Sequence, residues 1–303
     1  MDKLAAMRTF VEIVDRGSLT AAAGAQDRSL PTVVRTLASL EQQLGARLLR
    51  RTTRRMSLTV EGRDYLERCR RILADVEEAE LTVARGQSEP QGEIRMTAPA
   101  LFGQMHLAPA VTAFLARYRK VQVNLLLLDR VVNLVDEGID LALRIGPLSD
   151  SSMVAIPLGR MRRVVCASPG LLLEHGSPEH PELLAGRPCL QFPGTRASGH
   201  WRFREREREL SVPVRGAFSC SQALAVAEAC ADGLGFARLL HYQVAPLVRD
   251  GRLVIVLEEF EPEPLPVSLV YPEARLVSSR MRSLVAWLRD ALRERLAELG
   301  NAA

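Results

Sequence analysis

Residues 18–37 constrain the fold of this chain more than any other stretch. They read as a short helix, a polar turn and a second helix. Ser18 is a suitable N-cap for the first helix, and Ser29 is one for the second. Pro31 fits the first turn of the second helix, because a proline there sacrifices no hydrogen bond. Residues 26–28 are polar and supply the turn.

The second helix has two contrasting faces. Its apolar residues recur at helical spacing and predict a buried stripe: Val33, Leu37, Leu40 and Leu44. The opposite face has hydroxyls and a guanidinium but no acid: Thr32, Arg35, Thr36 and Ser39. Such a face suits the major groove of DNA, where these groups contact base edges and phosphates. The alternative is an ordinary solvated face of a small helical bundle.

A basic segment follows this helix. Five arginines lie among the nine residues from Arg47 to Arg55, and the apolar residues between and after them alternate as in two short strands around a turn. Residues 28–55 contain seven arginines and one acid, Glu41, whereas the whole chain has a net charge of only +4. This concentration of charge is typical of a wing that holds the phosphate backbone of DNA, and a solvated charge run is the alternative.

With these motifs the chain resembles the LysR-type transcriptional regulators over residues 1–303. The matching segments in the first part are residues 7–18, 29–31 with Arg35, 40–41, 44–45, 48–59 and 61–62; in the second part they are 98–99, 102–103, 140–146 and 166–169. The resemblance implies an N-terminal all-α winged helix-turn-helix with a long linker helix. A C-terminal α/β effector domain of the two-lobed, periplasmic-binding-protein-like type is expected to follow.

The sequence pattern and this resemblance divide the chain into three parts. We expect a winged helix-turn-helix domain at residues 1–59, a linker and dimerisation helix at 60–89, and an effector-binding domain at 90–303. Lobe I is expected at residues 90–162 and 267–303, and lobe II at 163–266. The linker has a long apolar stripe formed by Leu66, Cys69, Leu73, Val76 and Val83. It predicts pairing with a second chain, and packing on its own C-terminal domain is the alternative.

From Glu93 onward, strand patterns alternate with helix patterns, which predicts parallel sheets with crossover helices. The expected strands include residues 94–98, 121–128, 139–145, 164–167 and 216–218. The expected helices include residues 103–118, 131–137, 221–231 and 281–299, and the charged run at 202–209 predicts an exposed hairpin. Ligands of such sheets bind at the C-terminal ends of strands.

The resemblance places promoter DNA with an inverted repeat against the second helix and the wing. The predicted DNA-binding residues are Ser18, Ser29, Leu30, Pro31, Thr32, Val34, Arg35, Thr36, Arg51, Thr52, Thr53, Arg54 and Arg55. This sequence departs from the family pattern at three of its positions: Leu30 replaces a glutamine, Val34 a serine and Gln26 an apolar residue. We expect altered base contacts at the first two and a less tightly packed turn at the third.

The resemblance also places a small organic effector between the lobes. The predicted effector-binding residues are Ala100, Leu101, Phe102, Gly103, Asp129, Arg130, Arg144, Gly146, Ser219 and Ser221. The helix predicted after Ser221 has N–H groups without internal partners, which attract a carboxylate. Arg130 and Arg144 can add bidentate contacts, or Arg144 can pair with Asp136 or Asp140 instead. Leu101 stands where the family often has a hydroxyl, so an aromatic or alkyl organic acid is favoured.

Motifs for catalysis are missing: the sequence has no nucleophile elbow, phosphate-binding loop, dinucleotide fingerprint or zinc-protease signature. We therefore expect a protein that is not an enzyme and has no catalytic residue and no cofactor. We expect no metal site either, not even at His175 and His180. The five cysteines contain no C-x-x-C pair. Cys220 and Cys230 leave a redox-sensing input as the alternative to an organic effector, although they would lie about 15 Å apart along a helix.

The N-terminal residues lack the apolar core of a signal peptide, and no apolar run approaches the roughly 18 residues of a membrane span. We expect a cytoplasmic protein that makes no membrane contact and assembles as a dimer or tetramer. A free-standing solute-binding protein is the rival class, but it would need a signal peptide and would not need a basic head.

Overall fold

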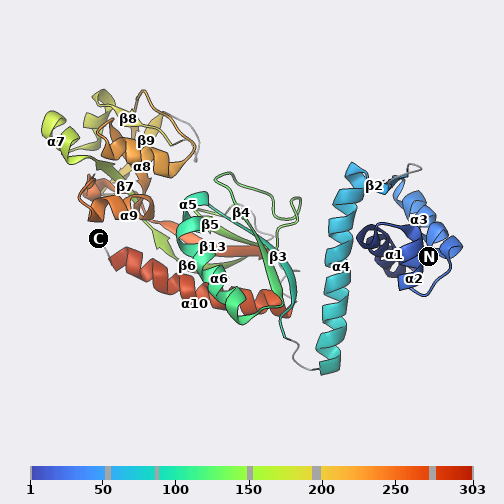
Figure 1. Cartoon of the computed structure of the whole chain (residues 1–303). Helices are drawn as coiled ribbons and strands as arrows, with labels where there is room; N and C mark the ends of the chain where they lie inside the picture. Colours follow the sequence, from blue (N-terminus) through green and yellow to red (C-terminus); the bar gives the residue numbers. More distant parts are fainter. Residues whose placement is uncertain are drawn as a thin grey trace. The chain divides into compact units, whose positions relative to one another are not determined.

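The computed structural model describes residues 2–51, 56–85, 89–148, 153–192, 199–272 and 278–301. The chain divides into two compact units, Met1–Glu89 and Pro90–Ala303, whose elements are labelled in Figure 1. Each unit encloses its own hydrophobic core.

The first unit consists of helices with one small hairpin. In chain order its elements are α1 (Lys3–Arg16), α2 (Leu19–Ala25), α3 (Leu30–Leu44), β1 (Leu49–Arg51), β2 (Met56–Leu58) and α4 (Val60–Arg85). The cap predicted at Ser18 is confirmed, since its side chain accepts the Ala21 N–H at 3.0 Å. Ser29 occupies the N-cap position of α3 but makes no capping hydrogen bond through its side chain. Gly17 ends α1 in the left-handed region, with φ of 69°.

The predicted stripe of α3 lies in the core of this unit. Val33, Leu37 and Leu40 are buried there against Phe10 of α1. Leu44 was predicted to continue the stripe, but its side chain is 36% exposed. The helix ends at this point, so no further turn exists to carry the stripe inward.

The turn between α2 and α3 is held by a polar contact. Thr9 of α1 is 1% exposed, and its hydroxyl lies 3.0 Å from Gln26 Oε1. Asp27 follows in the left-handed region, with φ of 50°. The Gln26 side chain thus has a buried polar partner, and the less tightly packed turn expected there stays a prediction.

The N-terminal half of α4 packs on its own unit. Leu66 and Cys69 are buried in the core and Leu73 packs against it. The rings of Tyr65 and Phe10 lie 5.9 Å apart. This part of the stripe is covered by its own chain, contrary to the expectation that the whole stripe pairs with a second chain.

The second unit contains a five-stranded sheet of order β4-β3-β5-β13-β6. Its strands are β3 (Gly92–Ala98), β4 (Val121–Leu127), β5 (Leu141–Ile145), β6 (Met153–Met161) and β13 (Leu265–Pro272). β3 is parallel to β4 and β5, whereas β13 is antiparallel to both β5 and β6. The predicted parallel pairing is confirmed for β3, β4 and β5 but not for β13, because the strand that returns from the second lobe enters in the opposite direction.

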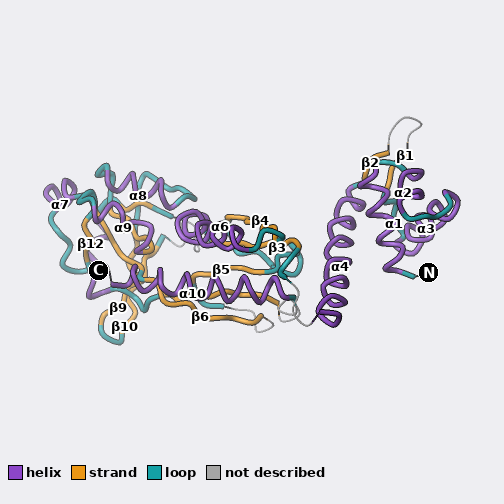
Figure 2. Tube along the Cα trace, turned by 60° about the horizontal axis from the view of Figure 1, so that its bottom comes forward, coloured by secondary structure: helices purple, strands orange, loops and turns teal. Residues whose placement is uncertain are grey.

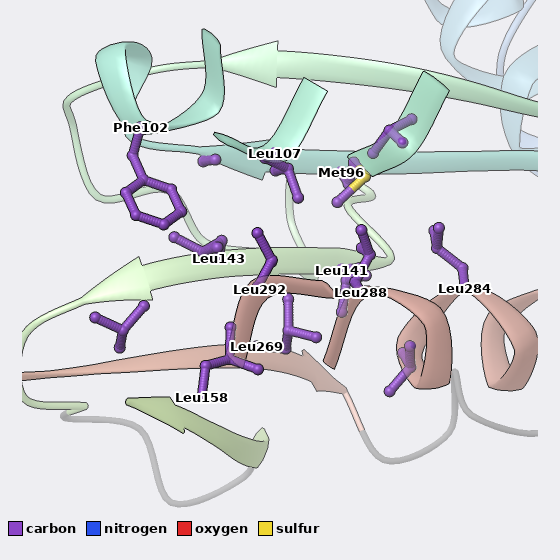
Figure 3. Close-up of a cluster of buried hydrophobic side chains, with 14 of the residues drawn as sticks. Met96, Phe102, Leu107, Leu141, Leu143, Leu158, Leu269, Leu284, Leu288 and Leu292 are labelled. Atoms are coloured by element: carbon purple, nitrogen blue, oxygen red, sulfur yellow. The ribbon is translucent and has the colours of Figure 1, made fainter. Parts of the chain in front are cut away.

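Helices cover one face of this sheet. They are α5 (Ala100–Phe102), the π-helical segment η1 (Gly103–Leu107), α6 (Ala108–Arg117) and α10 (Ser279–Asn301). α10 runs beside β6 (Figure 2). Figure 3 shows Leu284, Leu288 and Leu292 of α10 in the buried cluster with Leu143 of β5 and Leu269 of β13. The predicted helix at residues 103–118 is thus present but begins with a π turn.

The segment between β4 and β5 covers the opposite face. The side chains of this smaller core are Val132, Leu134, Ile139, Ala142 and Val270. A helix was predicted at residues 131–137, but the segment forms turns. The Asn133 side chain accepts the Val135 N–H at 3.0 Å. This local hydrogen bond competes with helical pairing.

A second, four-stranded sheet has the order β12-β7-β11-β8. Its strands are β7 (Arg163–Ala167), β8 (Cys189–Leu190), β11 (Phe236–Leu240) and β12 (Val254–Val256), accompanied by α7 (Pro169–His175), η2 (Pro181–Gly186), α8 (Ala223–Ala231), α9 (His241–Arg249) and η3 (Glu258–Phe260). The predicted hairpin is formed by β9 (His200–Glu205) and β10 (Arg208–Pro213). The strand predicted at residues 216–218 is reduced to single bridges at Arg215 and Ser219.

The chain crosses between the two sheets after β6 and again before β13. Arg162, on the first crossing, donates to both carboxylate oxygens of Glu261 on the second, at 2.9 and 2.7 Å. It also donates to Glu258 at 2.5 Å. Hydrogen bonds to Glu261 and Glu258 raise the pKa of Arg162. The two crossings are therefore tied together by charge-assisted hydrogen bonds.

Glu41 fixes the hairpin of the first unit to α3. This carboxylate is 7% exposed, and its Oε1 accepts the N–H groups of Leu48 at 2.8 Å and Leu49 at 3.2 Å. Its Oε2 accepts from Arg47 at 3.1 Å. A truncated side chain would leave two buried N–H groups unpaired.

We expect Glu41→Ala to lower the free energy of unfolding of the first unit by about 2–6 kcal/mol, since two N–H groups lose their acceptor and each unpaired N–H costs about 1–3 kcal/mol. Urea unfolding followed by circular dichroism measures this loss. Both tryptophans, Trp201 and Trp287, lie in the second unit, so their fluorescence should not change. The exposed Gln42→Ala is the matched control. An equal, small loss in both variants would contradict this role of Glu41.

Candidate nucleic-acid interface and effector site

The start of α3 presents an exposed surface. Leu30 is 41% exposed, and Pro31, Thr32 and Arg35 are also exposed. Val34 and Thr36 are half-buried. The surface is thus apolar at Leu30 and cationic at Arg35, with the Thr32 hydroxyl between them.

The two predicted serines behave differently. Ser18 is half-buried and caps α2, so its hydroxyl has a structural partner. Ser29 stands at the N-cap of α3, but its side chain makes no cap hydrogen bond there. Its Oγ lies 2.8 Å from Thr32 Oγ1, and both residues are exposed. Ser29 and Thr32 therefore form one small hydroxyl cluster on this surface.

The predicted wing is present as the β1–β2 hairpin, in which Leu49 pairs with Leu58. Leu48 and Leu49 anchor it in the core, and Arg50 is exposed. The side chain of Arg51 lies outside the described residues, as do Thr52, Thr53, Arg54 and Arg55.

Thr59 and Gly62 join the wing to α4. The Thr59 hydroxyl donates to Arg47 O at 2.7 Å and accepts the Gly62 N–H at 2.8 Å. A Cβ added at Gly62 would lie 2.0 Å from Leu48 O. Glycine at this position lets the helix start directly against the wing.

Residues 100–103, the first part of the predicted effector site, are mostly buried. Ala100 is 8% and Phe102 0% exposed, and a Cβ added at Gly103 would lie 2.1 Å from Leu127 Cδ2. These three residues therefore serve packing. Leu101 is half-buried and packs against the cores of both sheets.

No sequence pattern indicated the aromatic cluster beneath this segment. The Phe102 ring lies 4.9 Å from His106 and 5.2 Å from Tyr242, both at steep angles. Burial lowers the pKa of His106 to about 4, with a further contribution from Arg295. Burial raises the pKa of Tyr242 to about 12. Both side chains are thus uncharged at neutral pH.

Asp129 and Arg130 are engaged within the protein. Asp129 Oδ1 accepts the Ala100 N–H at 2.9 Å, so it holds the start of α5. Arg130 donates to both oxygens of Glu137, at 2.8 and 3.1 Å. The bidentate ligand contact predicted for Arg130 is therefore occupied by a carboxylate of the chain itself.

Arg144 is half-buried and donates to Val132 O at 2.8 Å. Burial lowers its pKa, and the charge of Glu137 opposes this effect. The suggested partner Asp140 instead accepts the Arg95 N–H at 2.9 Å. Arg144 and Gly146 line a hollow of about 340 Å³ in which residues 100–103, 219 and 221 take no part.

The third part of the predicted site lies on the second lobe. α8 begins at Ala223, two residues later than the predicted start at residue 221, and the side chain of its N-cap Gln222 makes no capping hydrogen bond. Ser219 and Ser221 are exposed. Cys220 between them packs against the same core as Leu101. Leu101 and the segment before α8 thus border the same core, whereas Arg144 and Gly146 line a different surface.

The cysteines are free thiols. Cys230 contacts Cys166 rather than Cys220: their Sγ atoms lie 3.9 Å apart, and both residues are buried. The hydrogen bond between these thiols, together with burial, raises the pKa of Cys166. A thiol held protonated in this way is a poor nucleophile toward oxidants.

Across the described residues, no helix is both long and apolar enough to span a bilayer. The same residues contain no group of three or more side chains suited to hold a metal ion.

The two units define a class of protein: a winged helix-turn-helix head joined to a two-sheet α/β domain. Residues 4–63 match the family described as bacterial regulatory helix-turn-helix protein, lysR family, and residues 87–293 match the LysR substrate binding domain. The chain therefore belongs to the LysR family of transcriptional regulators, which confirms the resemblance seen in the sequence.

Individual relatives agree with this assignment. The chain is 35% identical over 296 residues to an HTH-type transcriptional repressor of Pseudomonas aeruginosa, covering 97% of this chain and 93% of the relative. It is 33% identical over 289 residues to the regulator DmlR of Escherichia coli, covering 95% and 94%. The solved structure of CrgA, a LysR-type regulator from Neisseria meningitidis, has a TM-score of 0.61 at 30% identity, covering 95% and 98%.

Proposed function

We propose that this regulator binds an inverted repeat in promoter DNA through α3 and the wing, and that a small organic acid between its two lobes modulates the binding. It would act in the cytoplasm, where the promoter lies, and it would perform no catalysis. The exposed, acid-free start of α3 beside an arginine-rich hairpin carries this proposal.

Within the DNA site the residues take different roles. Arg35 and Thr32 are exposed on α3 and suit base edges or phosphates. Leu30 is exposed as well and suits a thymine methyl group, which replaces the polar readout usual at this position. The wing arginines Arg51, Arg54 and Arg55 neutralise phosphates.

We expect Arg54→Ala with Arg55→Ala to weaken binding to all sequences and to reduce the salt slope by about two. Arg35→Ala should also relax specificity, with a loss of about 1–3 kcal/mol on the preferred site. Fluorescence anisotropy at several salt concentrations, with the intergenic DNA beside its own gene, measures both effects. Arg249→Ala, an exposed site in the second unit, is the control. An unchanged slope after removal of both wing arginines would refute the wing assignment.

We further propose that α4 pairs two chains, giving a dimer or a tetramer. Leu73 is unsuitable for testing this, because it packs in its own head. Ile72 is 40% exposed on α4 and is apolar. It is the better probe of a seam between chains.

Ile72→Asp should yield monomers, because a charge in an apolar seam has no compensating partner. Light scattering measures the mass directly. Val60→Asp makes the same chemical change at the 60% exposed start of the helix and should leave the assembly intact. A dimer that survives Ile72→Asp would place the interface elsewhere.

The effector proposal rests on Leu101 and the start of α8. Leu101 is half-buried and contacts the cores of both lobes. The N-terminus of α8 nearby lacks a side-chain cap, so its N–H groups remain available for a carboxylate. An apolar wall facing such a group favours an aromatic or alkyl acid over a sugar.

A thermal-shift screen of small acids tests this site, since a ligand at 100 times its Kd stabilises a protein by about 2.7 kcal/mol. We expect shifts from apolar acids that are reduced in Leu101→Asp and in Ser221→Asp. Leu173→Asp, at an 89% exposed position, is the control. Hits restricted to neutral polar compounds, or undiminished in both variants, would show the site to be wrong.

A further inference from the structure

The hollow that contains Arg144 lies on the face of the five-stranded sheet opposite α6 and α10. Arg144 pairs with Ser268 and Ala142 pairs with Val270, so Arg144 and Val270 share the face of the smaller core. Leu141 and Leu143 of the same strand point to the other core, beneath the helices. This hollow is therefore distinct from the site proposed around Leu101.

The walls of the hollow are largely apolar. Its volume of about 340 Å³ falls within the range of small-ligand pockets, and Val132, Leu134, Ile145, Leu148, Met153 and Val270 contribute to its lining. Val131 and Leu148 at this site are 88% and 42% exposed. Apolar side chains left in water around a concave surface mark a place where a ligand gains from burial.

Arg144 is the one charged side chain among the described residues that line the hollow. Its hydrogen bond goes to a neutral carbonyl, Val132 O, at 2.8 Å. Burial disfavours this cation enough to lower its pKa. A half-buried guanidinium without a carboxylate partner has an unmet preference for an anion.

A neighbouring ion pair keeps this preference unmet. Glu137 is the carboxylate whose charge acts on Arg144. Both of its oxygens accept from Arg130, at 2.8 and 3.1 Å. Glu137 is thus paired with Arg130 rather than with Arg144.

We propose that this hollow binds a small monocarboxylate with an aliphatic or aromatic body. The carboxylate pairs with the planar fork of Arg144, which matches carboxylate geometry. The apolar body lies against Val132, Leu134 and Val270. The site goes beyond the effector site between the lobes and does not depend on it.

Calorimetric titration of the full chain with hexanoate and benzoate tests the proposal, with hexanamide and benzamide as neutral matches. We expect both acids to bind and both amides to bind at least 10-fold more weakly. Arg144→Gln should weaken acid binding at least 10-fold while leaving any amide binding unchanged. Leu101→Asp should leave the Arg144-dependent part of the acid binding unchanged, because Leu101 belongs to the other site.

Two variants at the Arg130–Glu137 ion pair leave Arg144 unchanged, and they should change the affinity for the acid in opposite directions. Glu137→Gln removes a competing acid and should tighten acid binding severalfold. Arg130→Gln frees Glu137 to pair with Arg144 and should weaken it severalfold. These two variants test whether Arg144 binds the carboxylate even if Arg144→Gln fails to fold.

Equal affinities for acid and amide would overturn the proposal. So would acid binding that is undiminished in Arg144→Gln, or that is indifferent to both Glu137→Gln and Arg130→Gln. Acid binding lost in Leu101→Asp but kept in Arg144→Gln would assign the acid to the site between the lobes and would likewise overturn it.

Discussion

The insertion of β13 between β5 and β6 is the interaction on which the effector-binding unit depends. This strand arrives only after the whole second lobe has been built, and it pairs antiparallel with both neighbours. Without it, the sheet that carries both cores of the first lobe would be interrupted. Arg162 reinforces the constraint, because it joins the two crossing segments through Glu261. The two lobes are therefore interdependent although each has its own sheet.

In the DNA-binding head, single polar side chains position a mostly apolar framework. Glu41 holds the backbone of the wing, Thr59 holds the start of α4, and Gln26 meets Thr9 at the turn. Each of these contacts satisfies a group that burial would otherwise leave unpaired. The wing is therefore held in place from its base. Glu41 also explains why a segment so rich in arginine keeps one acid.

In the effector-binding unit, pairing inside the chain decides which charges remain for a ligand. Arg130 is occupied by Glu137 and Asp129 by the start of α5, whereas Arg144 reaches only a neutral carbonyl. Residues that look equivalent in sequence thus differ in what they can bind. Leu101 and Arg144, predicted as one site, belong to two surfaces with different apolar surroundings.

The sequence by itself determined the helix-turn-helix, the wing and the hairpin at β9–β10, because local periodicity, caps and charge spacing set these elements. The alternating pattern also indicated an α/β domain. Tertiary structure alone decided that the sheets are mixed, since the direction of β13 follows from a chain reversal far along the sequence. It also decided that residues 131–137 form turns, and that Cys230 meets Cys166, because residues 64 apart come together only through packing. Burial and pairing are properties of the folded surroundings, so the sequence identified Phe102 and Arg130 but could not tell that one is core and the other already neutralised.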